Sequence, residues 1–446
     1  MTDLTALYAQ RLTSAAEAAA LIPSGSKIAM ALGVGQPPAI LKAIADRAEA
    51  GQVDDLRVYY LLSTSIAGDT VLRYDLMDRI HPYSLFHSAV ERRLDARAHD
   101  EGKAPVVQVI PTGFQQAPRI LCQEIGVDTL VATVSPMDAD GNFSFGTNTD
   151  YAQPVSRTAK RVILEVNPHM PRVFGQSTVH VSNVTAVVEN AVPLLEVPRA
   201  RPQPADTVIG GLIAGLVGDG ATLQMGIGAL PDAVCAALKD HKGLGIHTEM
   251  LTPGLVELMK AGVVNNARKS LNPGKTVFAF CMGDRSTYEY LRENPAIEGH
   301  PVSYVNDVHV IGQNERMVSV NATLEIDLNG ACCSEHLNGR QFTGSGGQLD
   351  FVRGAYASKG GQSIIACHAT AKSGTVSRIV PTLCGPVTTP RNDVHIVVTE
   401  YGVANLKGLS TAERARTLIG LAAPQFRDAL TAQATAMEPV YACGPA

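Results

Sequence analysis

A glutamate, Glu249, ends an apolar run that follows a glycine-rich turn, and this pairing of residue types could carry acyl-transfer chemistry. The turn is Gly226-Ile227-Gly228, and its exposed N–H groups, with those of a helix predicted to restart at Pro231, could receive an oxyanion. A carboxylate that faces such amides is placed to attack a carbonyl carbon. A glutamate with an ordinary pKa of about 4.3 is ionised at pH 7, as a nucleophile must be. The alternative interpretation is an ordinary solvated glutamate.

The elements that must position these residues are a strand, a turn, a helix and a second strand, predicted over residues 223–250. Ligands of open parallel sheets bind beyond the carboxyl ends of the strands, so the turn and Glu249, at the predicted strand tip, would share one edge. His247 would point to the same face as Glu249, and a core histidine is the favoured interpretation for it. Glu400, after a strand predicted over 394–399, is a rival carboxylate or a helix N-terminal residue.

The glycine turn recurs in the first half of the chain. Gly33-x-Gly35-x-x-Pro38 matches Gly226-x-Gly228-x-x-Pro231 at a constant offset of 193 residues (226 − 33), which predicts an internal repeat. At the equivalent strand end the first half has Ser63, with no carboxylate. The pattern is neither a dinucleotide fingerprint, since proline replaces the third glycine, nor a P-loop, which disfavours an NAD-linked oxidoreductase. A tight turn that simply needs glycine is the alternative for each copy.

Strands alternate with helix-length segments along the whole chain, which predicts an α/β fold with parallel or mixed sheets flanked by helices. A proline-rich linker at 198–204 separates two predicted domains, 1–197 and 205–446. Besides those above, strands are predicted over 27–32, 56–62, 106–110, 129–134, 161–166, 276–280, 308–311 and 364–366. Helices are predicted over 4–21, 205–217 and 411–430.

Composition excludes several classes of protein. With a net charge of −5 and no long basic run, the chain lacks the footprint of a nucleic-acid-binding protein. Neither a signal peptide nor an 18-residue apolar span is evident, so a soluble cytoplasmic protein without membrane association is expected. The eight cysteines show no C-x-x-C spacing, which favours reduced thiols over disulfides or a metal site.

Four motifs in the second half together resemble the acetyl-CoA hydrolase/transferase family. They are Gln224-x-Gly226-Ile227-Gly228-x-x-Pro231, Gly245-Ile246-His247-Thr248-Glu249-Met250, Gly344-x-Gly346-Gly347-Gln348-x-Asp350-Phe351 and Thr399-Glu400-Tyr401-Gly402-Val403-Ala404. Two further motifs, around 135–146 and 167–172, resemble the N-terminal half of that family, so the resemblance covers nearly the whole chain. It is nearest to the 4-hydroxybutyrate, butyrate and itaconate CoA-transferases. Asn405 stands where an acidic residue is expected.

This resemblance implies two similar CoA-transferase domains, with Glu249 as the nucleophile of a ping-pong reaction through a glutamyl-CoA thioester. It implies that Gln224, Met225, Gly226, Ile227 and Gly228 line the CoA site and supply oxyanion amides. Gly346, Gly347 and, less securely, Lys372 would also contact CoA. Other cations near the glycine-rich passages, Arg353, Lys359 and Arg378, are individually more typical of a solvated surface.

The expected substrates are an acyl-CoA, such as acetyl-CoA or succinyl-CoA, and a small C4–C5 carboxylate, such as 4-hydroxybutyrate or itaconate. No permanently bound cofactor is expected. The protein is expected to form a homodimer or a larger homo-oligomer. Two alternatives stay open at this point. An acyl-CoA hydrolase of the same family would keep Glu249 but admit water to the intermediate, and a non-catalytic acyl-CoA-binding sensor could dispense with a nucleophile.

Overall fold

The computed structural model describes residues 3–199 and 201–436 and divides into two compact units. Unit 1 comprises Met1–Pro198 and Val277–Val305, and unit 2 comprises Arg199–Thr276 and Asn306–Ala446. The division between the units after Pro198 falls within the predicted linker at 198–204. The predicted domains are continuous, whereas the compact units are not, because residues 277–305 group with unit 1.

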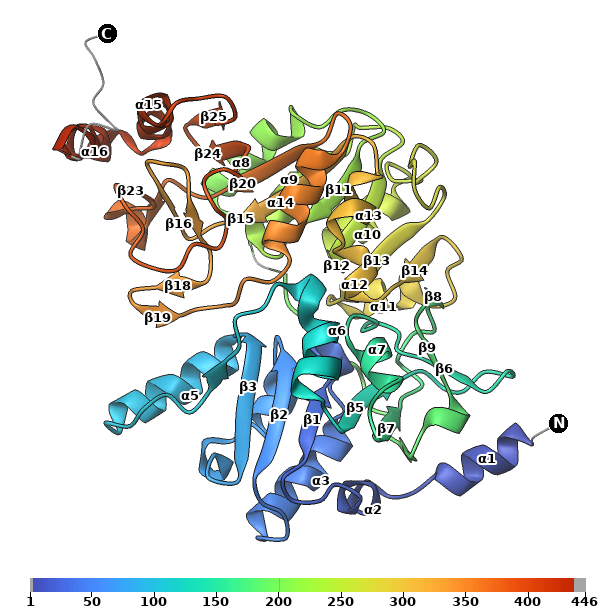
Figure 1. The fold of residues 1–446 in the computed structure, drawn as a ribbon. Coiled ribbons are helices and arrows are strands. Elements are labelled where there is room, and N and C mark those ends of the chain that lie inside the picture. Colours follow the sequence, from blue (N-terminus) through green and yellow to red (C-terminus); the bar gives the residue numbers. More distant parts are fainter. Residues whose placement is uncertain (1–2, 200, 437–446) are drawn as a thin grey trace. The chain divides into compact units, whose positions relative to one another are not determined.

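Unit 1 is built on a parallel seven-stranded sheet in the order β10-β7-β5-β1-β2-β3-β4 (Figure 1). The strands are β1 (Lys27–Met30), β2 (Leu56–Leu61), β3 (Ile80–Phe86), β4 (Gln108–Val109), β5 (Thr129–Val134), β7 (Arg161–Val166) and β10 (Ala186–Glu189). The bounds predicted for β5 and β7 are confirmed. Both are mainly apolar and almost fully buried, as expected for strands covered on both faces of a parallel sheet.

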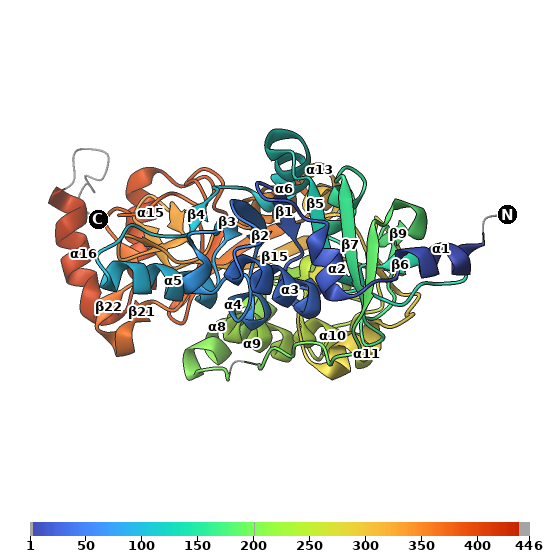
Figure 2. The same ribbon diagram turned by 90° about the horizontal axis from the view of Figure 1, so that it is seen from below.

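The longer helices of unit 1 are α1 (Leu4–Arg11), α2 (Ala15–Ala20), α3 (Pro38–Glu49) and α5 (Ala89–Asp100). The prediction of one helix over 4–21 is wrong. The chain turns extended at Leu12, and Ser14 then forms a capping box with Glu17 that starts α2. The helices α2 and α3 lie side by side against the sheet (Figure 2).

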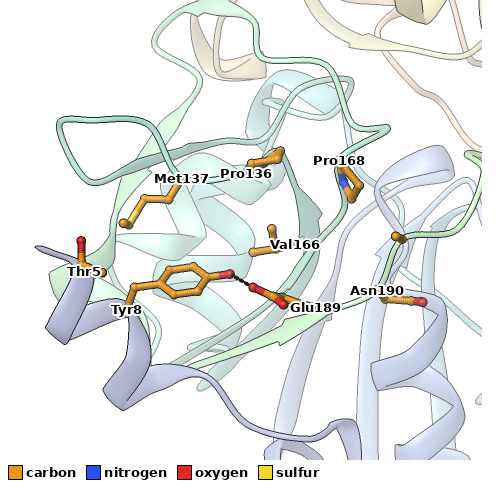
Figure 3. Close-up of a pocket in the computed structure, with 9 residues that line it drawn as sticks. Thr5, Tyr8, Pro136, Met137, Val166, Pro168, Glu189 and Asn190 are labelled. Atoms are coloured by element: carbon orange, nitrogen blue, oxygen red, sulfur yellow. Dashed lines mark hydrogen bonds between the residues drawn. The ribbon is translucent and has the colours of Figure 1, made fainter.

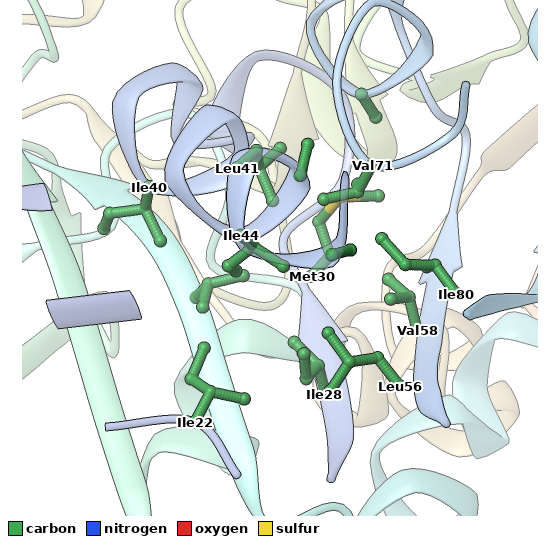
Figure 4. Close-up of a cluster of buried hydrophobic side chains, with 14 of the residues drawn as sticks. Ile22, Ile28, Met30, Ile40, Leu41, Ile44, Leu56, Val58, Val71 and Ile80 are labelled. Carbon is green, nitrogen blue, oxygen red and sulfur yellow. The ribbon is translucent and has the colours of Figure 1, made fainter. Parts of the chain in front are cut away.

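The core of unit 1 lies between α3 and the sheet (Figure 4). Ile40, Leu41 and Ile44 of α3 pack over apolar residues of β1, β2 and β3. These three side chains recur at helical spacing, so one face of α3 is apolar and must be buried. This packing fixes the turn between β1 and α3 at the carboxyl edge of the sheet.

Unit 1 also contains shorter elements. They are α4 (Ser65–Gly68), α6 (Ala117–Arg119), α7 (Ala152–Ser156), α11 (Arg285–Leu291) and α12 (Val302–Val305), and the strands β6 (Asn142–Ser144), β8 (Phe174–Gly175), β9 (Thr178–His180) and β14 (Ile297–Gly299). The strand β13 (Thr276–Cys281) begins at the last residue of the preceding segment of unit 2.

Unit 2 has strands in the order β25-β24-β20-β15-β11-β12, parallel except for the antiparallel pair β24–β25. The strands are β11 (Thr222–Met225), β12 (Gly245–Leu251), β15 (Met317–Ala322), β20 (Gln362–Ala366), β24 (Ile396–Thr399) and β25 (Gly402–Asn405). In unit 2, β11 lies between β12 and β15, just as in unit 1 β1 lies between β2 and β5. The predicted α/β fold of two similar units is therefore confirmed.

The helices of unit 2 are α8 (Pro204–Ala214), α9 (Ala229–Ala237), α10 (Pro253–Lys260), α13 (Val308–Gly312), α14 (Gln348–Ala357), α15 (Thr411–Leu421) and α16 (Pro424–Ala436). The strand predicted over 308–311 is wrong: this segment is α13, started by Asp307, whose side chain accepts hydrogen bonds from His309 N and Val310 N. The helical stretch predicted over 411–430 is two helices that meet just before Pro424. Small strands complete the unit: β16 (Glu325–Asp327), β17 (Cys332–Cys333), β18 (His336–Leu337), β19 (Arg340–Gln341), β21 (Thr370–Ala371), β22 (Val376–Ser377) and β23 (Ile379–Val380).

Among the described residues, no helix has the length and apolar character needed to cross a bilayer.

Candidate active site

Glu249 lies inside β12, two residues before its end, and not at the strand tip as predicted. The strand continues because Met250 and Leu251 are apolar and buried. The register pairs Thr222 with Gly245, so extending it places Gly226 level with Glu249 on the neighbouring strand. Because β11 ends at Met225, this register sets the partly buried residue Glu249 level with the start of the glycine turn. The turn and the carboxylate thus share the carboxyl edge of the sheet, as predicted.

Asn306 holds the Glu249 carboxylate. Its Nδ2 donates to Glu249 Oε2 at 2.6 Å and to Asp350 Oδ2 at 3.3 Å, so one amide group serves two carboxylates. Asn306 is 0% exposed and directly precedes the N-cap of α13, while Asp350 lies in the first turn of α14. A hydrogen bond to a partly buried carboxylate restricts its rotamers, so Asn306 fixes the position of the Glu249 side chain.

Gly347 is packed against the same carboxylate at the N-terminus of α14. A Cβ atom at this position would overlap both Glu249 Oε2 and Asn306 Nδ2. The backbone angles of Gly347, φ −99° and ψ 12°, are available to other residues, so it is the neighbouring carboxylate that demands glycine here. The positive end of the α14 dipole also favours a carboxylate at this place.

The glycine turn between β11 and α9 is open. Ile227 is 51% exposed, and a Cβ atom at Gly228 would meet nothing within 4 Å. Gly228 has φ +114°, a conformation that L-residues rarely adopt, and α9 begins directly after it. The amide of Gly226 donates to Val320 O at 3.0 Å. Asp232 N donates to Gly228 O at 3.2 Å and Pro231 has no N–H, so the amides of this segment that could receive an oxyanion are those of Ile227, Gly228, Ala229 and Leu230.

Gln224 and Met225 belong to β11, and their side chains are buried. The amide of Gln224 exchanges two hydrogen bonds with the amide of Asn321, at 3.3 and 3.2 Å. This pair ties the carboxyl ends of β11 and β15 together. Gln224 thus anchors the strand that leads into the turn, and its buried side chain exposes little surface to a ligand.

The corresponding glycine turn of unit 1 is filled. A Cβ atom at Gly33 would lie 2.9 Å from Met282 Sδ, and one at Gly35 would lie 2.8 Å from Asn148 Oδ1. The turn forms a single 3₁₀ turn that is fully buried. Glu165 of β7 accepts hydrogen bonds from Ala39 N and Ile40 N, so a carboxylate already occupies the N-terminus of α3. The structural interpretation of this first copy is confirmed.

The predicted cations differ in their surroundings. Arg353 pairs with Asp393 at 3.0 Å, Lys359 pairs with Glu315 at 3.2 Å, and Arg378 donates to two backbone carbonyl groups. Lys372 is exposed, in a hairpin between β21 and β22, and has φ +47°. None of the polar contacts within residues 3–199 and 201–436 joins Lys372 to Glu249 or to the glycine turn. Its contact with CoA stays a prediction.

Two further predicted candidates have structural roles. His247 is fully buried and lies 6.4 Å from the ring of Phe351, as expected for a core histidine. Glu400 follows β24, and its Oε2 accepts a hydrogen bond from Ala369 N at 2.8 Å, so this rival carboxylate ties two loops together. Asn405 lies in β25 and accepts a hydrogen bond from Lys407 N.

The sequence patterns predicted only some of the residues around the Glu249 carboxylate. Asp350 belongs to a motif of the resemblance but had no assigned role, and Asn306 belongs to no motif. Asn306 lies 57 residues after Glu249, next to a helix that the pattern predicted as a strand. The sequence carries no signal that would have found it.

A hollow of about 480 Å³ in unit 1 lies beyond the carboxyl ends of β5, β7 and β10 (Figure 3). Its wall is mainly apolar, and Tyr8 of α1 donates to Glu189 Oε1 at 2.6 Å. Burial and the neighbouring Glu189 carboxylate raise the pKa of Tyr8. All of its lining residues belong to unit 1, whereas every predicted site residue belongs to unit 2. Within the described part of the chain, no cluster of His, Cys, Asp and Glu side chains is arranged to hold a metal ion.

Two family models match the chain. The N-terminal domain of acetyl-CoA hydrolase/transferase matches residues 2–196, and the C-terminal domain matches residues 283–434. Among curated proteins, the succinyl-CoA:cyclohexane-1-carboxylate CoA transferase of Geobacter metallireducens is 42% identical over 96% of both chains. The 4-hydroxybutyrate coenzyme A transferase of Clostridium kluyveri is 41% identical over 95% of this chain and 97% of its own length.

Solved structures agree with this placement. RipA from Yersinia pestis superposes with a TM-score of 0.94 at 55% identity, over 98% of this chain and 100% of that one. A 4-hydroxybutyrate CoA-transferase from Porphyromonas gingivalis superposes with a TM-score of 0.80 at 36% identity, over 96% and 98% of the two chains. The chain therefore belongs to the acetyl-CoA hydrolase/transferase family, and the predicted enzyme class, a CoA-transferase, is confirmed.

Proposed function

We propose that this enzyme moves CoA from acetyl-CoA or succinyl-CoA to a small C4–C5 carboxylate, such as 4-hydroxybutyrate or itaconate, through a glutamyl-CoA thioester on Glu249. The observation that carries the proposal is the position of the Glu249 carboxylate. It is held by Asn306 against the bare backbone of Gly347, on the strand next to the one that leads into the open glycine turn. The rival carboxylate, Glu400, has different surroundings, since it accepts a hydrogen bond from the backbone amide of Ala369.

The first half-reaction has two steps. The Glu249 carboxylate attacks the thioester carbonyl carbon, the C–S bond breaks, and CoA leaves as a thiolate from a mixed acyl-glutamyl anhydride. The thiolate then attacks the glutamyl carbonyl carbon of this anhydride. The C–O bond breaks, the donor acid leaves as a carboxylate, and Glu249 is left as its CoA thioester.

The second half-reaction reverses these steps with a new acid. The acceptor carboxylate attacks the glutamyl thioester and releases the CoA thiolate, which then attacks the acceptor acyl carbon and frees Glu249. Each tetrahedral intermediate carries an oxyanion. Amides at Ile227, Gly228 and the first turn of α9 are suitable donors when the carbonyl carbon that is attacked belongs to the substrate, and Asn306 Nδ2 is suitable when it belongs to Glu249.

The names of the relatives support a carboxylate acceptor. They include transferases for 4-hydroxybutyrate and butyrate, which are C4 monocarboxylates, for the larger monocarboxylate cyclohexane-1-carboxylate, and for the dicarboxylate succinate. Itaconate is also a dicarboxylate, so as an acceptor it would need an additional cation in the acyl pocket. We also propose a homo-oligomer in the cytoplasm. The cytoplasmic location is supported by the free thiols of the seven cysteines among the described residues.

The test is trapping of the intermediate. The protein is incubated with acetyl-CoA or succinyl-CoA without an acceptor, and its intact mass is measured and followed by peptide mapping. We expect an adduct of CoA less one water on the Glu249 peptide, removed by hydroxylamine and absent in Glu249→Ala. The matched control is Glu400→Gln, which removes the charge of the rival carboxylate and should still form the adduct.

Other outcomes identify the alternatives. Steady release of free CoA without an adduct would indicate an acyl-CoA hydrolase. Tight binding of CoA with neither adduct nor turnover would contradict the enzymatic proposal and indicate a sensor. Once the adduct is established, a panel of carboxylates identifies the acceptor by the rate at which each discharges it.

A further inference from the structure

Only the nitrogen end of the Asn306 side-chain amide forms hydrogen bonds with described residues. Its Nδ2 donates to Glu249 and Asp350, while its Oδ1 is buried and accepts no hydrogen bond from any described residue. An amide can rotate by half a turn with little change of shape, which would point its oxygen at the nucleophile. Because Asn306 is 0% exposed, solvent does not hold it in place. The two carboxylates therefore determine which end of the amide faces the reaction.

Glu249 loses its charge when it reacts. In the anhydride and in the thioester, one of its carboxylate oxygens has become a neutral carbonyl oxygen, which is a weaker hydrogen-bond acceptor than a carboxylate. Asp350 does not react, so its carboxylate oxygen continues to accept the hydrogen bond from Asn306 Nδ2. During the covalent half of the cycle, Asp350 is thus the partner whose acceptor oxygen does not change, and it continues to hold the Asn306 amide.

We propose that Asp350 is a positioning residue for the nucleophile: it keeps the Asn306 N–H directed at Glu249 while Glu249 passes between carboxylate, anhydride and thioester. The proposal rests on the proposed function. No bond to Asp350 or Asn306 forms or breaks. The N–H donated to the glutamyl carbonyl oxygen polarises that carbonyl group and stabilises the oxyanion when a thiolate or a carboxylate attacks it.

The geometry of α14 suits this role. Asp350 is the third residue of the helix, and Gly347 is its N-cap, so the segment that leaves room for Glu249 also carries the residue that orients Asn306. Helices hold side chains more rigidly than loops, and a displacement of about 1 Å at a reacting group can cost about 100-fold in rate.

The test is a double-mutant cycle between Asp350→Ala and Asn306→Ala, with kcat and KM of the transfer reaction as readouts. We expect Asp350→Ala to lower kcat about 10- to 100-fold with little change in KM. In the Asn306→Ala background the same change should have almost no further effect, because Asp350 acts through Asn306. Asp350→Asn retains a neutral acceptor for the Asn306 amide and should keep kcat within about fivefold of the wild type.

Thermal unfolding accompanies each measurement, with Glu413→Gln as the matched control. Glu413 is also a first-turn carboxylate of a helix, α15, and caps Ser410 away from the nucleophile's contacts. Additive losses in the two Ala variants, or equal losses in Asp350→Asn and Asp350→Ala, would overturn the positioning role. If instead wild-type protein forms no glutamyl-CoA adduct, the proposed function itself fails, so the two failures are distinguishable.

Discussion

At Gly347 the absence of a side chain leaves room for the Glu249 carboxylate. The backbone conformation there suits alanine, and what alanine lacks is space, since its Cβ would overlap Glu249 Oε2 and Asn306 Nδ2. We expect Gly347→Ala to displace the nucleophile and lower kcat at least 100-fold, with little change in the unfolding temperature.

Gly211→Ala is the control for this change. Gly211 lies within α8, and a Cβ atom there would meet nothing within 4 Å, so the variant should stay fully active. Steady-state kinetics and thermal unfolding of both variants decide the matter. A Gly347→Ala enzyme with the kcat of the wild type would show that Glu249 does not act from its observed position.

The residues of the site were predictable to different degrees. Glu249 and Gly347 belong to motifs with recognisable spacing, so the sequence identified both. Their contact with each other, and with Asn306, depends on β12, α13 and α14 meeting in space. Spacing along the chain says nothing about such long-range contacts, which explains why Asn306 was missed.

At the scale of elements, one sequence pattern serves two different turns. The turn of unit 1 is filled by Asn148 and Met282, whereas that of unit 2 is open. We expect Gly35→Ala to destabilise the protein by about 1–3 kcal/mol, because its Cβ would crowd Asn148, while the folded variant keeps its kcat.

The equivalent change at Gly228 should act on catalysis. Its φ of +114° is unfavourable for alanine although the space is free, so the turn must change its backbone conformation. We expect kcat/KM to fall at least tenfold. Urea unfolding and kinetics of the two variants test the contrast, and normal activity in Gly228→Ala would show that the turn supplies no oxyanion donor.

Element prediction succeeded where tertiary context and local pattern agree. The strands β5 and β7 are mainly apolar segments with β-branched residues, bounded by polar or turn residues, so their bounds followed from the sequence. The segment 308–311 is a short apolar run with β-branched residues, which periodicity alone does not distinguish from a strand. There Asp307 starts a helix instead. Likewise, Ser14 interrupts an otherwise helical pattern because its hydroxyl caps a new helix.

For the whole molecule, the repeat in sequence corresponds to a repeat in topology, with the motif strand in the same position of each sheet. The two turns nevertheless differ: that of unit 1 is filled by Asn148 and Met282, whereas that of unit 2 is open and level with Glu249 in the strand register. The grouping of residues 277–305 with unit 1 was not predictable, because no change of composition marks either end of that segment.

The stability of the whole molecule should depend on pH through a carboxyl group in unit 1. Asp150 is 0% exposed, and burial raises its pKa to about 7 from an ordinary value of 3.8. Its Oδ1 accepts a hydrogen bond from Tyr151 N at 2.7 Å, which lowers the pKa only in part. The folded state therefore keeps a proton at Asp150 that the unfolded state has lost.

Between about pH 4 and pH 7 the folded state binds more protons at Asp150 than the unfolded state, so this group lowers the free energy of unfolding as the pH rises. The loss of unfolding free energy reaches about 4 kcal/mol near pH 7 and stays constant above it.

Asp150→Asn removes the titration and keeps an acceptor for Tyr151 N. Urea unfolding at several pH values should therefore find this variant more stable than the wild type at pH 8, with a difference that shrinks towards pH 5. Asp140→Asn, at an exposed loop position of the same unit, should show no such trend. A difference for Asp150→Asn that does not change with pH would mean that the buried carboxyl group does not titrate in this range.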